Sequence, residues 1–231
     1  MPLEERSYSG KFFRPRPEVL ADPQDQLFLV ATPWGPRSTA KKTIQVIQDH
    51  FLSSLEDQEA TSPFPTLSCL SAAENNLRTS LQIANQNIYR EDNRNEYTAG
   101  VELFAATLKG NELIWAQVGQ PAVFLSRPNS PLVPLNTPID MTTDFAHKKN
   151  SLHPLPQTLL GIDPSVNLTS QSVRLHLGDE ILLLSRSTLP PSLFSLSESD
   201  RSVDAVSRVL AKSDSEMPFW IGKIHFESVL S

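Results

Sequence analysis

The chain has 231 residues, 39% of them hydrophobic and 20% charged, with 19 prolines and 8 glycines. Its formal net charge is -6 and it carries no basic stripe, which argues against a protein that binds nucleic acid or an anionic membrane. A single cysteine, Cys69, excludes an intramolecular disulfide. No apolar run has the length of a signal sequence core or a membrane span, so we expect a cytoplasmic protein.

The first part of the chain is expected to form short strands and then two helices. Phe12 and Phe13 indicate an early strand, and the apolar run 27–31 indicates a second, buried one. Apolar residues at steps of three and four predict a helix from Ser38 to Leu55 and another over about 72–89. Acidic, serine and proline residues predict a loop between the two helices.

From residue 101 the hydrophobic pattern changes to a period of two. It predicts an antiparallel meander of three strands over 101–127, with a turn at 109–111. A proline-rich, irregular connection follows at about 128–156. The remainder predicts two strands joined by a turn at Gly178 and Asp179, then short helices near 190–194 and 203–211, and a last strand over 219–226. With no internal repeat, we expect a single layered α+β domain over 1–231.

Four segments of this chain resemble the PPM family, the type 2C metal-dependent serine/threonine protein phosphatases. The segments are "LFLVATPWGPRSTAKK", "LFAATLKGNELIWAQVGQPAVFLSR", "LLGIDPSVNLTSQSVRLHLGDEILLLSRSTLPPSLF" and "SDSEMPFWIGKIHF". They occur in the family's order, and the resemblance covers nearly the whole chain. It implies a four-layer α-β-β-α sandwich with central antiparallel β-sheets.

In the family, aspartates at the strand ends hold two Mg²⁺ or Mn²⁺ ions. Hard divalent cations require oxygen ligands, and the metal pair generates the nucleophilic water and clamps the phosphate. In this sequence most of the aligned acidic positions carry other residues, namely Val19, Thr32, Gln120 and Arg186. A family glycine that helps to hold metal aligns with Pro33, while Glu18 is retained and Glu216 is acidic where the family has Asp-Asn.

Three arginines are candidates for phosphate binding, because guanidinium groups match phosphate oxygens in charge and geometry. Arg14 aligns with the family's phosphate-contacting arginine, and Arg37 and Arg186 lie at other motif positions. We also expect Arg186 to occupy the space of a lost metal and to pair with Glu18 or Glu216. Trp34 is expected either to cover the altered site or to anchor a partner.

These replacements predict a pseudophosphatase, which is not an enzyme, needs no cofactor or metal, and binds a protein in signalling. The partner would be a protein and could be a phosphoprotein. One alternative is a residual metal-dependent phosphoprotein phosphatase with a single ion held by Glu18, Glu216 and Asp214. Another is a purely structural subunit whose interface is the proline-rich connection.

Overall fold

The computed structural model describes residues 2–22, 27–56, 62–145 and 153–226. The chain divides into two compact units. The first unit comprises Met1–Arg16, Gly119–Gln157 and His176–Ser231, and the second comprises Pro17–Val118 and Thr158–Leu175. No helix in the described ranges is long and apolar enough to cross a membrane.

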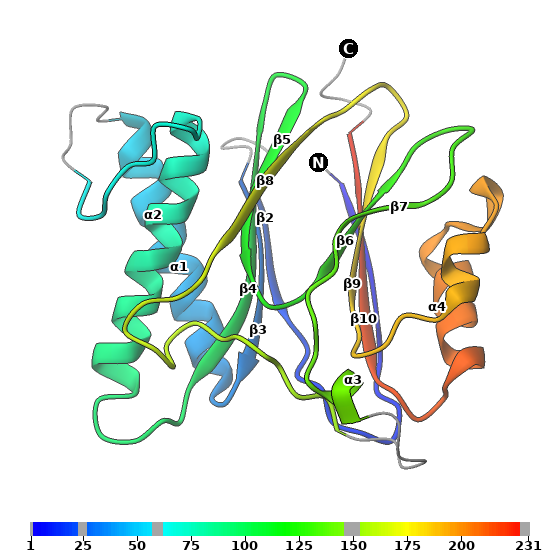
Figure 1. Ribbon diagram of the computed structural model, residues 1–231, viewed down its shortest axis with the longest axis horizontal. Helices are drawn as coiled ribbons and strands as arrows, with labels where there is room; N and C mark the ends of the chain where they lie inside the picture. The colour runs from blue at the N-terminus through cyan, green and yellow to red at the C-terminus, as the bar shows by residue number, and fades with distance from the viewer. Residues whose placement is uncertain (1, 23–26, 57–61, 146–152, 227–231) are drawn as a thin grey trace. The chain divides into compact units, whose positions relative to one another are not determined.

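The second unit contains a five-stranded antiparallel sheet in the order β2-β3-β4-β5-β8. Its strands are β2 (Glu18–Asp22), β3 (Leu27–Trp34), β4 (Gly100–Lys109), β5 (Glu112–Val118) and β8 (Thr169–Arg174). Two helices, α1 (Arg37–Glu56) and α2 (Ala72–Asn87), lie side by side against the sheet, and one π-helical turn, Ile88–Asp92, continues α2 (Figure 1).

The core of the second unit is the interface between these helices and the sheet. It contains apolar residues from α1 and α2, such as Ile47 and Leu81, and alternate residues of β3, such as Leu29. The helical period of 3.6 and the strand period of two bring these side chains to one interface. A capping box fixes the start of α2, because Ser71 and Glu74 each accept the other's backbone N–H.

The first unit also contains a five-stranded antiparallel sheet, in the order β1-β10-β9-β6-β7. Its strands are β1 (Leu3–Tyr8), β10 (Phe219–His225), β9 (Glu180–Ser185), β6 (Ala122–Ser126) and β7 (Val133–Asn136). Helix α4 (Val203–Ser213) packs on it through Val206 and Leu210. Short helical segments are α3 (Thr142–Phe145), η2 (Pro191–Ser195) and η3 (Glu198–Asp200).

The predicted α+β class with antiparallel sheets and flanking helices is confirmed. Two local predictions are wrong. Phe12 and Phe13 lie outside any strand, and the amino-terminal strands are β1 and β2. The predicted meander ends at β5, because β6 belongs to the other sheet. The two strands predicted on either side of the turn at Gly178 are present as β8 and β9, and they pair in different sheets.

The proline-rich connection contains more structure than the sequence indicated. It includes strand β7 and helix α3, and an antiparallel bridge pairs Asp140 with Pro156. Part of the predicted connection, residues 146–152, lies outside the described ranges. The described part therefore supplies ordered backbone around Asp140.

Candidate phosphate-binding site

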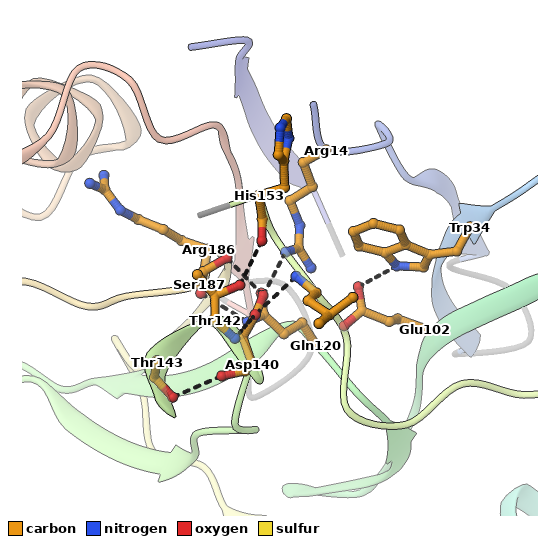
Figure 2. A network of polar contacts seen from close by, with 11 residues as sticks. Arg14, Trp34, Glu102, Gln120, Asp140, Thr142, Thr143, His153, Arg186 and Ser187 are labelled. Atoms are coloured by element: carbon orange, nitrogen blue, oxygen red, sulfur yellow. Dashed lines mark hydrogen bonds and ion pairs between the residues drawn. The ribbon is translucent and has the colours of Figure 1, made fainter. Parts of the chain in front are cut away.

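In the second unit, strand β3 carries two of the altered metal positions. Thr32 lies opposite Glu102 of β4, and Pro33 lies opposite Val101. Both Thr32 and Glu102 are buried, and the Thr32 hydroxyl has no hydrogen-bond partner among the described residues. Glu102 accepts a 2.9 Å hydrogen bond from the Trp34 indole Nε1 (Figure 2). The register therefore places a carboxylate on the strand next to the position where the family has one.

Glu102 was missed in the sequence because it occurs inside an apolar strand and in none of the aligned acidic positions. The tight loop after β3 has a clear backbone requirement. Gly35 has a φ of 136°, and a Cβ atom there would lie 2.2 Å from the Thr98 carbonyl oxygen. Only glycine fits this position, which explains why Gly35 remains in a loop that follows Pro33 and Trp34.

The start of helix α1 carries an arginine–carboxylate pair of the second unit. Arg37, the first residue of α1, donates from Nε to a Glu18 carboxylate oxygen. The Arg37 side chain is 68% exposed. Val19, the next residue of β2, pairs with Val30 in the sheet. Of the two neighbouring residues Glu18 and Val19, only Glu18 is charged, and its carboxylate pairs with Arg37.

In the first unit, Gln120 and Arg186 contact one another. The Gln120 side-chain Nε2 donates to the backbone carbonyl of Arg186 at 2.9 Å. The Arg186 guanidinium is buried and points toward the carboxyl end of α4. There it donates to the Leu210 carbonyl at 2.8 Å, and to the Ser213 hydroxyl and Asp214 carbonyl at 3.2 and 3.3 Å. The side chain thus adds donors at the carboxyl end of α4, where the Leu210 carbonyl also accepts from the Asp214 N–H and the Ser213 hydroxyl.

The expected pairing of Arg186 with Glu216 is wrong, and Glu18 belongs to the other unit. Its hydrogen bonds go to the end of α4, and its guanidinium lies 5.7 Å from the centre of the Phe219 ring. Burial lowers the pKa of Arg186, and the nearby charge of Asp214 opposes that shift. Glu216 instead pairs with Lys11 at 3.1 Å. The Arg186 guanidinium therefore donates to oxygen atoms at the end of α4 and not to a carboxylate.

A buried ion pair in the first unit forms the centre of a polar network that sequence reasoning missed. Arg14 Nη1 lies 3.7 Å from Asp140 Oδ2, and both side chains are only 2% exposed. Asp140 Oδ2 accepts from the Ser187 hydroxyl at 2.7 Å, and Oδ1 accepts from the backbone N–H groups of Thr142 and Leu155 (Figure 2). Asp140 therefore links the amino-terminal segment, the proline-rich connection and the end of β9.

The three candidate phosphate-binding arginines therefore have different surroundings. Arg186 is directed at α4, so its donors serve the fold. Arg37 is exposed beside Glu18, and Arg14 is buried beside Asp140. The first unit thus holds Arg14, and the second unit holds Arg37, as cations that face a carboxylate and remain candidates for phosphate.

The acidic residues of the candidate metal site each have other partners within their own unit. In the described parts of the chain, no group of three or more His, Cys, Asp or Glu side chains is arranged to hold a metal. Glu18 and Glu216 pair with cations, and Asp214 accepts the backbone N–H of Glu216 at 2.9 Å. The alternative of a single ion held by these three residues stays a prediction, because Glu18 belongs to the second unit and the other two residues belong to the first.

Comparison with solved structures shows the fold of the PPM Ser/Thr phosphatases. PppA of Pseudomonas aeruginosa, described as a key regulatory component of its T6SS, matches with a TM-score of 0.65 and 17% identity over 96% of both chains. The PPM Ser-Thr phosphatase MsPP of Mycobacterium smegmatis matches with 0.66 and 15% over 97% of both chains. The serine/threonine phosphatase PstP of Mycobacterium tuberculosis matches with 0.61 and 17% over 96% of this chain and 97% of its own.

No family model and no curated protein matches the sequence. At these identities the structural likeness establishes the fold, and the recognition of a PPM-type fold is confirmed. The prediction that the chain is not an enzyme is contradicted by the same comparison. The similar structures are Ser/Thr phosphatases, and one is a catalytic domain in complex with two manganese ions.

Proposed function

We propose that this protein is a phosphoprotein phosphatase of the PPM type with a degenerate metal site. It binds a phosphorylated serine or threonine segment and removes the phosphate slowly. The observation that carries the proposal is the match of nearly the whole chain, 96–97%, to Ser/Thr phosphatases. The altered acids argue for a low rate, because paired metals normally supply the nucleophile and neutralise the phosphate.

Arg14 is the residue that we propose to bind the phosphate group. Guanidinium groups make charge-assisted and often bidentate hydrogen bonds to phosphate oxygens. Its side chain already faces the Asp140 carboxylate within the first unit. In this proposal, Arg14 binds and orients the phosphate.

Phosphate release from a phosphoserine peptide tests the proposal. The full chain is incubated with the peptide in Mn²⁺ or in EDTA, and inorganic phosphate is measured at high enzyme concentration over hours. We expect slow turnover with Mn²⁺ that EDTA abolishes and that Arg14→Gln reduces about tenfold or more, the usual scale for a lost charged contact. Phosphate release no faster than in a no-protein control would contradict the phosphatase assignment.

A second candidate function is a phosphoprotein-binding regulatory module. It is favoured by the replacements at Val19, Thr32, Gln120 and Arg186 and by the description of PppA as a regulatory component. Binding needs only the arginine, whereas efficient hydrolysis needs a nucleophile as well. Equal phosphopeptide binding in Mn²⁺ and EDTA, combined with slow turnover, would favour this role over bulk dephosphorylation.

A further inference from the structure

The Asp140 carboxylate is held by three hydrogen bonds that are shorter than its distance to Arg14. Its three hydrogen bonds, to the Ser187 hydroxyl and the Thr142 and Leu155 N–H groups, measure 2.7, 2.9 and 3.0 Å. The nearest guanidinium nitrogen of Arg14 lies 3.7 Å away, which exceeds hydrogen-bond length. The attraction between the two groups is therefore mainly electrostatic, and Asp140 keeps its position through other donors.

This geometry has a consequence for any anion that approaches Arg14. The carboxylate stays in place, so an incoming phosphate meets an arginine whose charge is already balanced. Both side chains are 2% exposed, so solvent screens their charges only weakly. A phosphomonoester carries a charge of about -1.5 to -2 near pH 7 and is repelled by Asp140 more strongly than a monoanion is.

We infer that Asp140 is a built-in competitor of phosphate for Arg14, which weakens the binding of phosphorylated segments and penalises dianions more than monoanions. The inference rests on the proposed function, because it assumes that Arg14 binds the phosphate of a phosphoprotein. It assigns to Asp140 a role beyond folding. The carboxylate sets the affinity of the site, while the hydrogen bonds that hold it keep the surrounding backbone in place.

The test compares two pentapeptides in EDTA, with phosphoserine or O-sulfoserine at the centre and alanines on either side. O-sulfoserine is a monoanion of similar shape. Affinities for the full chain are measured by NMR or calorimetry at pH 8. In the wild type the sulfopeptide should bind at least as tightly as the phosphopeptide. Asp140→Asn retains an oxygen for the backbone donors, and should tighten phosphopeptide binding about tenfold but sulfopeptide binding only about threefold.

Ser187→Ala is the matched control, because it removes one hydrogen bond from Asp140 and keeps the negative charge. It should change either affinity less than twofold. If Asp140→Asn does not fold, as judged by its near-UV circular dichroism, Asp140→Ser provides a second neutral acceptor, and the wild-type preference remains a test by itself.

The outcomes separate the inference from the proposed function. If Asp140→Asn binds the phosphopeptide no more tightly than the wild type, or tightens both peptides equally, the inference is overturned and phosphoprotein binding stands. A wild type that prefers the phosphopeptide strongly also overturns it. Failure of every variant to bind either peptide overturns the proposed phosphate binding, and the inference with it.

Discussion

Arg14 in the first unit and Arg37 in the second unit each face a carboxylate, but their surroundings differ greatly. The Arg14 and Asp140 side chains are 2% exposed, and Asp140 is held by three further donors. The Arg37 side chain is 68% exposed, and that of its partner Glu18 is 19% exposed. Solvent screens the exposed pair and leaves it worth little, whereas breaking a buried pair leaves a charge uncompensated.

The comparison shows that similar side-chain chemistry serves two purposes in this molecule. The buried pair joins segments distant in sequence, and its loss should destabilise the fold. The exposed pair is a surface feature that an external anion can rearrange at low cost. Four substitutions test this contrast, and they are ordered here from the largest expected effect to the smallest.

Asp140→Ala should have the largest effect, a loss of about 3–5 kcal/mol in the free energy of unfolding. It leaves buried Arg14 without its carboxylate, and the Ser187 hydroxyl and two backbone N–H groups without an acceptor. Urea denaturation of the full chain measures it. The exposed acid Asp204, which pairs with Arg6 at the surface, provides the control Asp204→Ala. Equal destabilisation by the two variants would mean that the buried Arg14–Asp140 pair contributes no more to stability than an exposed ion pair.

Arg186→Ala should cost about 2–3 kcal/mol, because it removes donors at the end of α4 and a buried guanidinium that lies 5.7 Å from the centre of the Phe219 ring. Thermal unfolding monitored by circular dichroism measures it. Adding Mn²⁺ should not rescue the variant, because the Arg186 guanidinium donates its hydrogen bonds to the end of α4. A Mn²⁺-dependent recovery of the melting temperature would show that the capping role is misassigned.

The Arg127–Asp179 pair is intermediate, and its contribution depends on pH. Arg127 donates two hydrogen bonds to the buried Asp179 carboxylate, at 2.9 and 2.7 Å. Burial alone would raise the pKa of Asp179, but the Arg127 and His176 hydrogen bonds outweigh it and lower that pKa. The stabilisation is therefore present above about pH 4, the ordinary pKa of aspartate, and is lost as the pH falls through the lowered value.

Asp179→Asn should accordingly lower the free energy of unfolding at pH 7 by about 1–2 kcal/mol. The difference from the wild type should shrink as the pH falls below about 4, because the unfolded wild-type chain then binds a proton at Asp179, and it is lost once the folded carboxylate is protonated below its lowered pKa. Urea denaturation at a series of pH values follows this change. A deficit that stays constant from pH 7 to pH 3 would mean that the charge of Asp179 contributes nothing.

Arg37→Ala should have the smallest effect, less than about 1 kcal/mol, because solvent already screens the pair with Glu18. Chemical denaturation in low salt and in 0.5 M NaCl should show a small difference that salt removes. A loss of 2 kcal/mol or more, unaffected by salt, would place Arg37 in the same structural class as Arg14.

The secondary structure was predictable where its pattern is local. Helices α1 and α2 follow from apolar residues at helical spacing, and β4 and β5 from the change to a period of two around the turn at 109–111. Sheet membership was not predictable, because β6 and β9 join partners distant in sequence. The polar strand β1 lacks the apolar alternation that identifies a half-buried strand.

The site was predictable only in part, for a related reason. Family motifs located Thr32, Gln120 and Arg186 in the chain, but they carry no information about new contacts. Arg186 donates to a carbonyl of α4, and Asp140 pairs with Arg14. Both contacts join residues distant in sequence, so no sequence spacing reveals them. Glu102 was hidden because a charged residue within an apolar strand gives no signal until the register pairs it with Thr32.

The most direct test of the account is a ³¹P NMR titration of a phosphoserine peptide with the full chain in EDTA. Arg14→Gln removes the proposed phosphate contact, and Arg16→Gln is the matched control, because Arg16 lies two residues away with an exposed side chain paired to Glu5. We predict a saturable shift of the phosphate resonance with the wild type and Arg16→Gln that is lost with Arg14→Gln. An identical titration with all three proteins, or no shift with the wild type, would contradict phosphate binding at Arg14.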